Sequence, residues 1–155
     1  MSAKDFQGRV LILDYGSQTT QLIARRVREC HVYCEIHPFS ISLEKIKKFE
    51  PKGIILSGGP ASVYEPGAPL NPPELFRLGI PTLGICYGMQ LLTFALGGEV
   101  ARSSKREYGR SELIIDDEGD LFAGLSSGTA IPVWMSHGDR IQRLPVGFRV
   151  IAHTS

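Results

Sequence analysis

Four short apolar segments, each followed by a turn and a stretch with helical spacing, most constrain how this chain can fold. The apolar segments cover residues 9–14, 32–36, 53–57 and 81–85, and Gly or Pro residues bound them. Runs of this length and setting predict buried strands. Helices are predicted after Ser17 or Thr19 and over residues 42–49, 74–78 and 89–96. This alternation predicts an α/β fold with a doubly wound, mostly parallel sheet flanked by helices.

The pattern changes after Gly98. Three shorter strands are predicted there, and turns join them: Glu99–Arg102, Arg110–Ile115 and Ala130–Met135. We expect them to form an antiparallel extension of the same domain. The chain has no internal repeat, low-complexity segment or linker, so residues 1–155 are predicted to be one domain.

Composition and charge exclude several function classes. The 155 residues include 17 basic and 16 acidic side chains, and a formal charge of +1 provides no basic surface for nucleic acid or anionic membrane. No apolar run is long enough to span a bilayer, and the polar residues 1–8 lack the apolar stretch of a signal peptide. An odd number of cysteines, three, argues against a disulfide framework. We therefore expect a cytoplasmic protein with reduced thiols.

The segment Gly84-Ile85-Cys86-Tyr87-Gly88 has the form G-x-C-x-G between a predicted strand and a predicted helix. Such a turn holds a nucleophile in strained backbone above the carboxyl end of the sheet, and its glycines let strand and helix approach closely. The dipole of the following helix favours a thiolate. A small buried cysteine at a tight turn is the alternative. The strand, the helix and both glycines favour a nucleophile that forms a thioester with an acyl substrate.

A nucleophile of this kind also needs hydrogen-bond donors for the oxyanion. The residue after the nucleophile, here Tyr87, commonly supplies one backbone N–H. The turn Gly58-Gly59-Pro60 ends the neighbouring predicted strand and can supply another. A phosphate-binding loop is excluded at this turn because no Gly-Lys-Ser/Thr follows and no helix begins at once. A plain turn stays an alternative.

These motifs resemble those of class I (triad) glutamine amidotransferases, whose fold is flavodoxin-like. Gly84–Gln90 resembles the nucleophile motif of the family, and Leu56–Pro60 its oxyanion segment. Three further stretches are similar to the branch of the family whose ammonia aminates XMP to GMP: Asp14–Gln18, Arg106–Gly109 and Trp134–Asp139. The resemblance runs from about Val10 to the last residue.

The resemblance implies a reaction and its residues. Cys86 attacks the side-chain carboxamide of L-glutamine, ammonia leaves, and water releases glutamate from the thioester. The N–H groups of Gly58, Gly59 and Tyr87 are implied to hold the oxyanion. The amino-acid end of glutamine is implied to contact these residues: Gln90, Ser136, His137, Gly138 and Asp139.

The resemblance also implies partners. No metal or cofactor is expected in this domain. An ATP-pyrophosphatase domain or subunit, which uses ATP and Mg²⁺, is implied to receive the ammonia, and the parent protein is implied to be a homodimer.

One part of the family pattern is missing. The general base for the thiol is a histidine oriented by a glutamate in a His-Pro-Glu segment, which does not occur among the four histidines, His31, His37, His137 and His153. His137 fits the substrate-binding loop, and we see no carboxylate partner for His153. We expect a domain that is incomplete at its C-terminal end, without the ATP-pyrophosphatase and dimerisation domains. Such a chain is expected to be a weak or inactive catalyst alone.

Other interpretations remain. The chain could be the amidotransferase of another synthetase (for anthranilate, carbamoyl phosphate or CTP), a Cys-elbow hydrolase, or a non-catalytic glutamine-binding module. The metal-capable residues of Cys30-His31-x-x-Cys34-x-x-His37 straddle a predicted helix end and a strand. We expect no metal site there, because such side chains do not converge on one ion.

Overall fold

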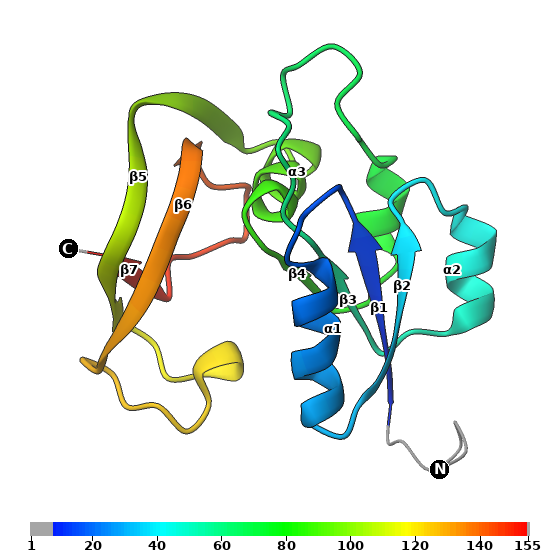
Figure 1. The fold of residues 1–155 in the computed structure, drawn as a ribbon, viewed down its shortest axis with the longest axis horizontal. Coiled ribbons are helices and arrows are strands. Elements are labelled where there is room, and N and C mark those ends of the chain that lie inside the picture. Colours follow the sequence, from blue (N-terminus) through cyan, green and yellow to red (C-terminus); the bar gives the residue numbers. More distant parts are fainter. Residues whose placement is uncertain (1–7, 155) are drawn as a thin grey trace.

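The computed structural model describes residues 8–154, and for residues 103–107 and 136–137 it describes the backbone alone. Two sheets lie side by side, with helices around the larger one (Figure 1). The elements are β1 (Arg9–Asp14), α1 (Thr20–Glu29), β2 (Tyr33–Pro38), α2 (Leu43–Phe49), β3 (Gly53–Leu56), η1 (Pro73–Arg77), β4 (Thr82–Gly84), α3 (Tyr87–Ala95), β5 (Glu99–Ile115), η2 (Asp120–Phe122), β6 (Ala130–Arg143) and β7 (Ala152–Thr154).

The larger sheet has four parallel strands in the order β2-β1-β3-β4. Side chains alternate across a strand, so β1 contributes to two cores. Ile12 packs with Ala24 of α1 on one face. On the other face, Leu11 and Leu13 pack in a cluster that includes residues of α2, η1 and α3. Helices on both faces of a parallel sheet confirm the predicted doubly wound α/β fold.

Local sequence signals predict most of the ends of the helices around the parallel sheet. The side chain of Ser42 accepts a hydrogen bond from the Lys45 N–H (3.3 Å) and caps α2, as predicted. Gly97 has a φ of +84° just after α3, a conformation that glycine adopts without strain. Thr19 precedes α1 without a side-chain cap, and the Ser17 hydroxyl instead accepts from the Thr19 N–H (3.1 Å). The predicted helix over 74–78 is a 3₁₀ helix, η1.

The second sheet differs from the prediction. Its order is β6-β5-β7, and both pairs are antiparallel, as expected for the extension. The two predicted strands Glu99–Arg102 and Arg110–Ile115 are one strand, β5, and β6 continues past Met135 to Arg143. The ladder between β5 and β6 shifts register between Arg102 and Glu107. Pairing with β6 on both sides of the shift therefore keeps residues 103–107 in one strand, although their polar sequence predicted a turn.

Figure 1 shows α3 between the two sheets. It contacts β3 and β4 on one side and β5 and β6 on the other. Cys86 precedes α3, so the helix joins the predicted nucleophile to both sheets. Within residues 8–154, no helix has the length and apolar character to cross a membrane.

Candidate active site

Cys86 occupies a strained turn between β4 and α3. Its φ of 51° and ψ of −114° are rare for a residue with a side chain. Two hydrogen bonds fix the turn to the end of β3: the Ile85 N–H donates to Leu56 O (3.0 Å), and the Gly88 N–H donates to Ser57 O (3.1 Å). The strained nucleophile turn expected from the sequence is therefore present at the carboxyl end of the sheet.

The glycines on either side of Cys86 lie where no side chain fits. A Cβ atom at Gly84 would lie 2.6 Å from the Gly88 carbonyl oxygen and from the Met89 Cα. At Gly88 it would overlap the Leu56 carbonyl and lie 2.6 Å from the Leu56 Cβ. The close approach of strand and helix that the motif predicted is therefore built from backbone against backbone.

The Cys86 thiol has a mixed environment. The residue is exposed to solvent on one side. Protein atoms on the other side bury it enough to raise the pKa of the Cys86 thiol above its ordinary value. This shift opposes the effect of the α3 dipole, which we expected to favour the thiolate. Since no ion pair or hydrogen bond joins the sulfur to any residue the structure describes, the thiol needs a base to become a nucleophile.

One predicted oxyanion donor, Gly58, lies beside Cys86, and a second, Tyr87, follows it in the chain. A Cβ atom at Gly58 would lie 3.4 Å from the Cys86 Cβ and 3.6 Å from the Ser17 Oγ. Gly58 thus lies beside the nucleophile. Within the described residues, the backbone N–H groups of Gly58, Gly59 and Tyr87 have no acceptor. Gly58 and Tyr87 are therefore neighbours of Cys86, and the oxyanion role of these three N–H groups stays a prediction.

Two residues that we had given no role hold this turn in place. Ser57 is fully buried, accepts a hydrogen bond from the Tyr15 N–H (3.0 Å) and donates one to Gly58 O (2.8 Å). A Cβ atom at Gly59 would lie 2.5 Å from Tyr15 O, so the backbone of Tyr15 supports Gly59 directly. Both residues lie inside the sequence motifs, but only the tertiary contact reveals their function.

The predicted glutamine-binding residues are only partly assembled. Gln90 lies one turn after Cys86, buried on α3, and its N–H donates to Cys86 O (3.1 Å). No hydrogen bond to its carboxamide occurs among the described residues. Ser136–Asp139 lies within β6, so the predicted loop is wrong, and the side chains of Ser136 and His137 are outside the described set. Gly138 and Asp139 continue this strand, with Asp139 opposite Arg102.

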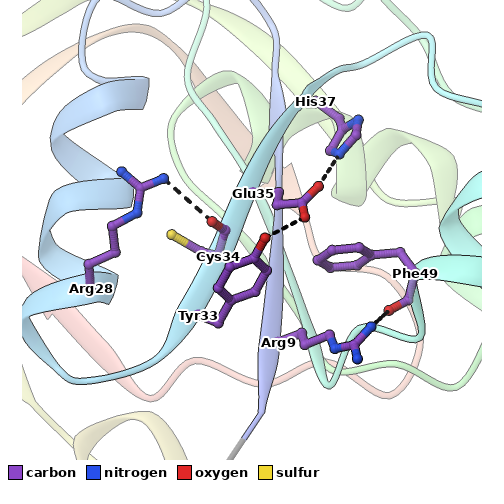
Figure 2. Close-up of polar contacts among 7 residues, drawn as sticks. All are labelled: Arg9, Arg28, Tyr33, Cys34, Glu35, His37 and Phe49. Carbon is purple, nitrogen blue, oxygen red and sulfur yellow. Dashed lines mark hydrogen bonds and ion pairs between the residues drawn. The ribbon is translucent and has the colours of Figure 1, made fainter. Parts of the chain in front are cut away.

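None of the described histidine side chains lies at Cys86. His37 pairs with Glu35 (2.8 Å), and Glu35 also accepts from the Tyr33 hydroxyl (2.6 Å), as Figure 2 shows. This His–Glu pair lies on β2, which is separated from β4 by two strands. Three strand spacings put it about 14 Å from the nucleophile.

The other two histidines with described side chains are placed by different contacts. His31 follows α1 at the amino end of β2, away from the edge that carries Cys86. His153 does have a carboxylate partner, contrary to our expectation: its Nδ1 lies 2.8 Å from the Asp116 carboxylate. The antiparallel pairing of β7 with β5 creates this contact between residues distant in sequence.

The segment from Cys30 to His37 does not gather its metal-capable residues. Cys34 is buried and its thiol donates to Ala24 O (3.5 Å), whereas Cys30 is exposed. In the described part of the chain, no three His, Cys, Asp or Glu residues are grouped to hold a metal ion.

Known proteins are similar to this chain in sequence. A GMP synthase (glutamine-hydrolyzing) from Desulfotalea psychrophila is 56% identical over 147 residues, which are 95% of this chain and 28% of the relative. The GMP synthase of Wolinella succinogenes is 59% identical over 150 residues, again 28% of its length. The chain therefore spans about 28% of the length of the curated relatives it matches.

Solved structures agree on the fold. A candidate GMP synthase component from Thermoplasma acidophilum superposes with a TM-score of 0.77 at 26% identity, covering 95% of this chain and 73% of that one. A glutamine amidotransferase from Thermotoga maritima has a TM-score of 0.69 at 23% identity, covering 94% and 66%. The family model for class-I glutamine amidotransferases matches residues 11–155. This chain belongs to the class I glutamine amidotransferase family.

Proposed function

We propose that this chain is a glutamine amidotransferase domain in which Cys86 is the nucleophile that releases ammonia from glutamine. The observation that carries the proposal is the strained Cys86 turn near the backbone N–H groups of Gly58, Gly59 and Tyr87, which have no acceptor among the described residues. We propose that the oxygen of an acyl group bound to the sulfur accepts hydrogen bonds from these donors.

The reaction balances in two steps. The Cys86 sulfur adds to the carboxamide carbon of glutamine, and the tetrahedral intermediate collapses with loss of the nitrogen, which takes a proton as ammonia. Water then attacks the thioester, and glutamate and the free thiol are released. Gln90 is proposed to bind the amino-acid end of glutamine, since it lies one turn after Cys86 and its carboxamide has no hydrogen bond to the described residues. Ser136, His137, Gly138 and Asp139 keep a proposed substrate role.

Both steps need a base, and the structure supports none from the described histidines. The pKa of the thiol is raised by burial, which lowers the thiolate fraction at neutral pH. We propose that a histidine and a glutamate outside this chain supply the base, so that the chain alone turns over glutamine slowly or not at all. The domain spanning 1–155 is proposed to be one part of a longer amidotransferase.

Ammonia is proposed to serve the amination of XMP to GMP. The support is the 56–59% identity to proteins named GMP synthase, of which this chain matches 28%. The proposal includes an ATP-pyrophosphatase domain or subunit that uses ATP and Mg²⁺, a homodimeric parent, and no cofactor bound by this domain. The cytoplasmic location stays a prediction.

A mass measurement tests the nucleophile. The chain is treated with the glutamine analogue 6-diazo-5-oxo-norleucine, and intact mass is compared between wild type and Cys86→Ala. We expect one adduct that the variant loses. Cys30→Ala is the matched control, since this exposed cysteine lies away from the site and its loss should leave the adduct in place. An adduct that persists in Cys86→Ala would refute the assignment. An adduct on the full-length Desulfotalea psychrophila relative but not on this chain would mean that residues outside the chain are needed to build the site.

A chimera tests the destination of the ammonia. This chain replaces the matching segment of the Desulfotalea psychrophila protein, and amination of XMP is measured with glutamine and with ammonium. We expect both to support the reaction, and Cys86→Ala to abolish the glutamine-dependent rate alone. If the chimera aminates XMP from ammonium but not from glutamine even with Cys86 intact, this amidotransferase serves a different synthetase.

A further inference from the structure

A set of polar contacts joins the loop between β3 and η1 to the segments that carry the oxyanion donors. The Tyr15 hydroxyl donates to the Asn71 side-chain oxygen (2.5 Å), and the Asn71 amide nitrogen donates to Phe39 O (2.8 Å). Asn71 therefore bridges the segments that follow β1 and β2 at the carboxyl edge of the sheet. The Tyr87 hydroxyl donates to Pro69 O (3.1 Å) in the same loop.

The two tyrosines also contact each other. Their ring centroids are 5.5 Å apart, and Tyr15 stacks on Phe39 at 5.8 Å. Both are almost fully buried, with 4% of Tyr15 and 1% of Tyr87 exposed, so neither ring can move without displacing the core. Burial raises the pKa of Tyr87 to about 12 and that of Tyr15 further, so both hydroxyls are protonated donors at neutral pH.

Each tyrosine either supplies a proposed oxyanion donor or contacts the turn that supplies one. Tyr87 provides one of the N–H groups itself. The Tyr15 backbone holds the other two, because its N–H donates to Ser57 Oγ, Ser57 donates to Gly58 O, and the Tyr15 carbonyl lies against Gly59. We propose that Tyr15 and Asn71 are positioning residues that hold the Gly58–Gly59 turn at the distance from Cys86 that oxyanion binding requires.

This inference rests on the proposed function and makes a separate prediction. Removing the Tyr15–Asn71 hydrogen bond should let the Gly58–Gly59 turn relax. Cys86 should keep its own strained turn, because hydrogen bonds to the Leu56 and Ser57 carbonyls fix it. Reactions that need the oxyanion donors should slow, and reactions that need only an exposed thiol should not. Misplacement by a fraction of an ångström to 1 Å is worth about 10- to 100-fold in rate.

The test compares two reagents on the same chain. The rate of Cys86 labelling is measured with 6-diazo-5-oxo-norleucine, which requires the glutamine site, and with iodoacetamide, which requires only the thiol. Tyr15→Phe and Asn71→Ala remove the bond from either side. We expect each to slow the first reaction about tenfold and to change the second less than about twofold. The double variant should be no slower than Asn71→Ala, since that change alone already removes the Tyr15–Asn71 bond, together with the bond from Asn71 to Phe39 O.

Tyr64→Phe is the matched control, because it removes a hydroxyl from the same loop that has one hydrogen bond among the described residues, accepted from the Val100 N–H (3.4 Å). Its labelling should equal that of wild type with both reagents. The inference is overturned if Tyr15→Phe and Asn71→Ala label at the wild-type rate, or if both reagents slow equally, which would indicate general loosening. If 6-diazo-5-oxo-norleucine still labels the Cys86→Ala variant, the proposed function itself is overturned, and the inference with it.

Discussion

Replacing Gly88 by alanine should damage both stability and the nucleophile turn. Alanine is the better helix former by about 1 kcal/mol, so Gly88→Ala in an isolated helix would be favourable. Here the new methyl group would lie 2.6 Å from the Leu56 Cβ and overlap the Leu56 carbonyl. Carbon atoms of this kind do not approach closer than 3.0 Å, so α3 must move away from β3 by at least 0.4 Å.

That movement has a calculable cost. The hydrogen bond from the Gly88 N–H to Ser57 O, now 3.1 Å, would lengthen toward 3.5 Å, where it is nearly lost. Overpacking costs about 1–3 kcal/mol and a lost hydrogen bond about 1 kcal/mol. After the gain in helix propensity, the free energy of unfolding should fall by about 1–3 kcal/mol. For a chain of this size, the melting temperature should fall by about 2–12 °C.

The assay is thermal and urea unfolding followed by circular dichroism, with Gly53→Ala as the matched control. Gly53 lies in β3, where a Cβ atom would meet Pro81 O at 3.8 Å and the Val10 side chain at 3.9 Å, which are ordinary contacts. Its replacement should leave stability unchanged or raise it by about 0.5–1 kcal/mol. The reasoning is refuted if Gly88→Ala is as stable as wild type, or if both variants lose stability equally.

Three further predictions test the site and its support. Ser57→Ala should lower the free energy of unfolding by about 1–3 kcal/mol in urea titrations, because it leaves the buried Tyr15 N–H unpaired; an unchanged midpoint would contradict this. Ser42→Ala removes the cap of α2 and should cost about 1 kcal/mol, whereas Ser42→Asp, which keeps an acceptor, should not. The rate of Cys86 alkylation by iodoacetamide should rise with pH to a midpoint above that of a cysteine peptide, because the folded pKa is raised and the thiolate reacts; an equal or lower midpoint would contradict the burial effect.

The parallel half of the fold was predictable because its signals are local. The strand over 9–14 has the bounds that its apolar run indicated, and Ser42 marks the start of α2 as a cap residue should. Small differences arise where the sequence is ambiguous. α3 begins at Tyr87 rather than Met89, because a glycine in the first turn of a helix, here Gly88, does not prevent helix formation.

The antiparallel half was less predictable because pairing decides it. Residues 103–107 are polar and gave no alternating apolar signal, yet β6 supplies a partner backbone on both sides of the register shift. The same hairpin extends β6 through Gly138 and Asp139, which the resemblance had placed in a loop. The hydrogen bond between His153 and Asp116 spans 37 positions and depends on β7 lying beside β5.

The candidate site also has a part that local sequence predicts and a part that only tertiary contacts reveal. The nucleophile turn is encoded by adjacent residues, Gly84 to Gly88, so one segment of sequence is enough to identify it. Its support comes from far along the chain: Ser57 contacts Tyr15 across 42 positions, and Asn71 contacts Tyr15 across 56. A motif search selects residues that react, and it passes over those that only hold them.

Under the proposed function, catalysis in this domain can fail without loss of the nucleophile. Cys86 keeps its strained turn through bonds to Leu56 and Ser57, whatever happens in the loop that carries Asn71. The donors at Gly58 and Gly59 depend on Tyr15, and Tyr15 depends on that loop. A change in the loop is therefore predicted to leave a reactive cysteine without its proposed oxyanion site. Such a variant would still be alkylated by simple reagents, and it would lose the reaction in which a tetrahedral oxyanion must form.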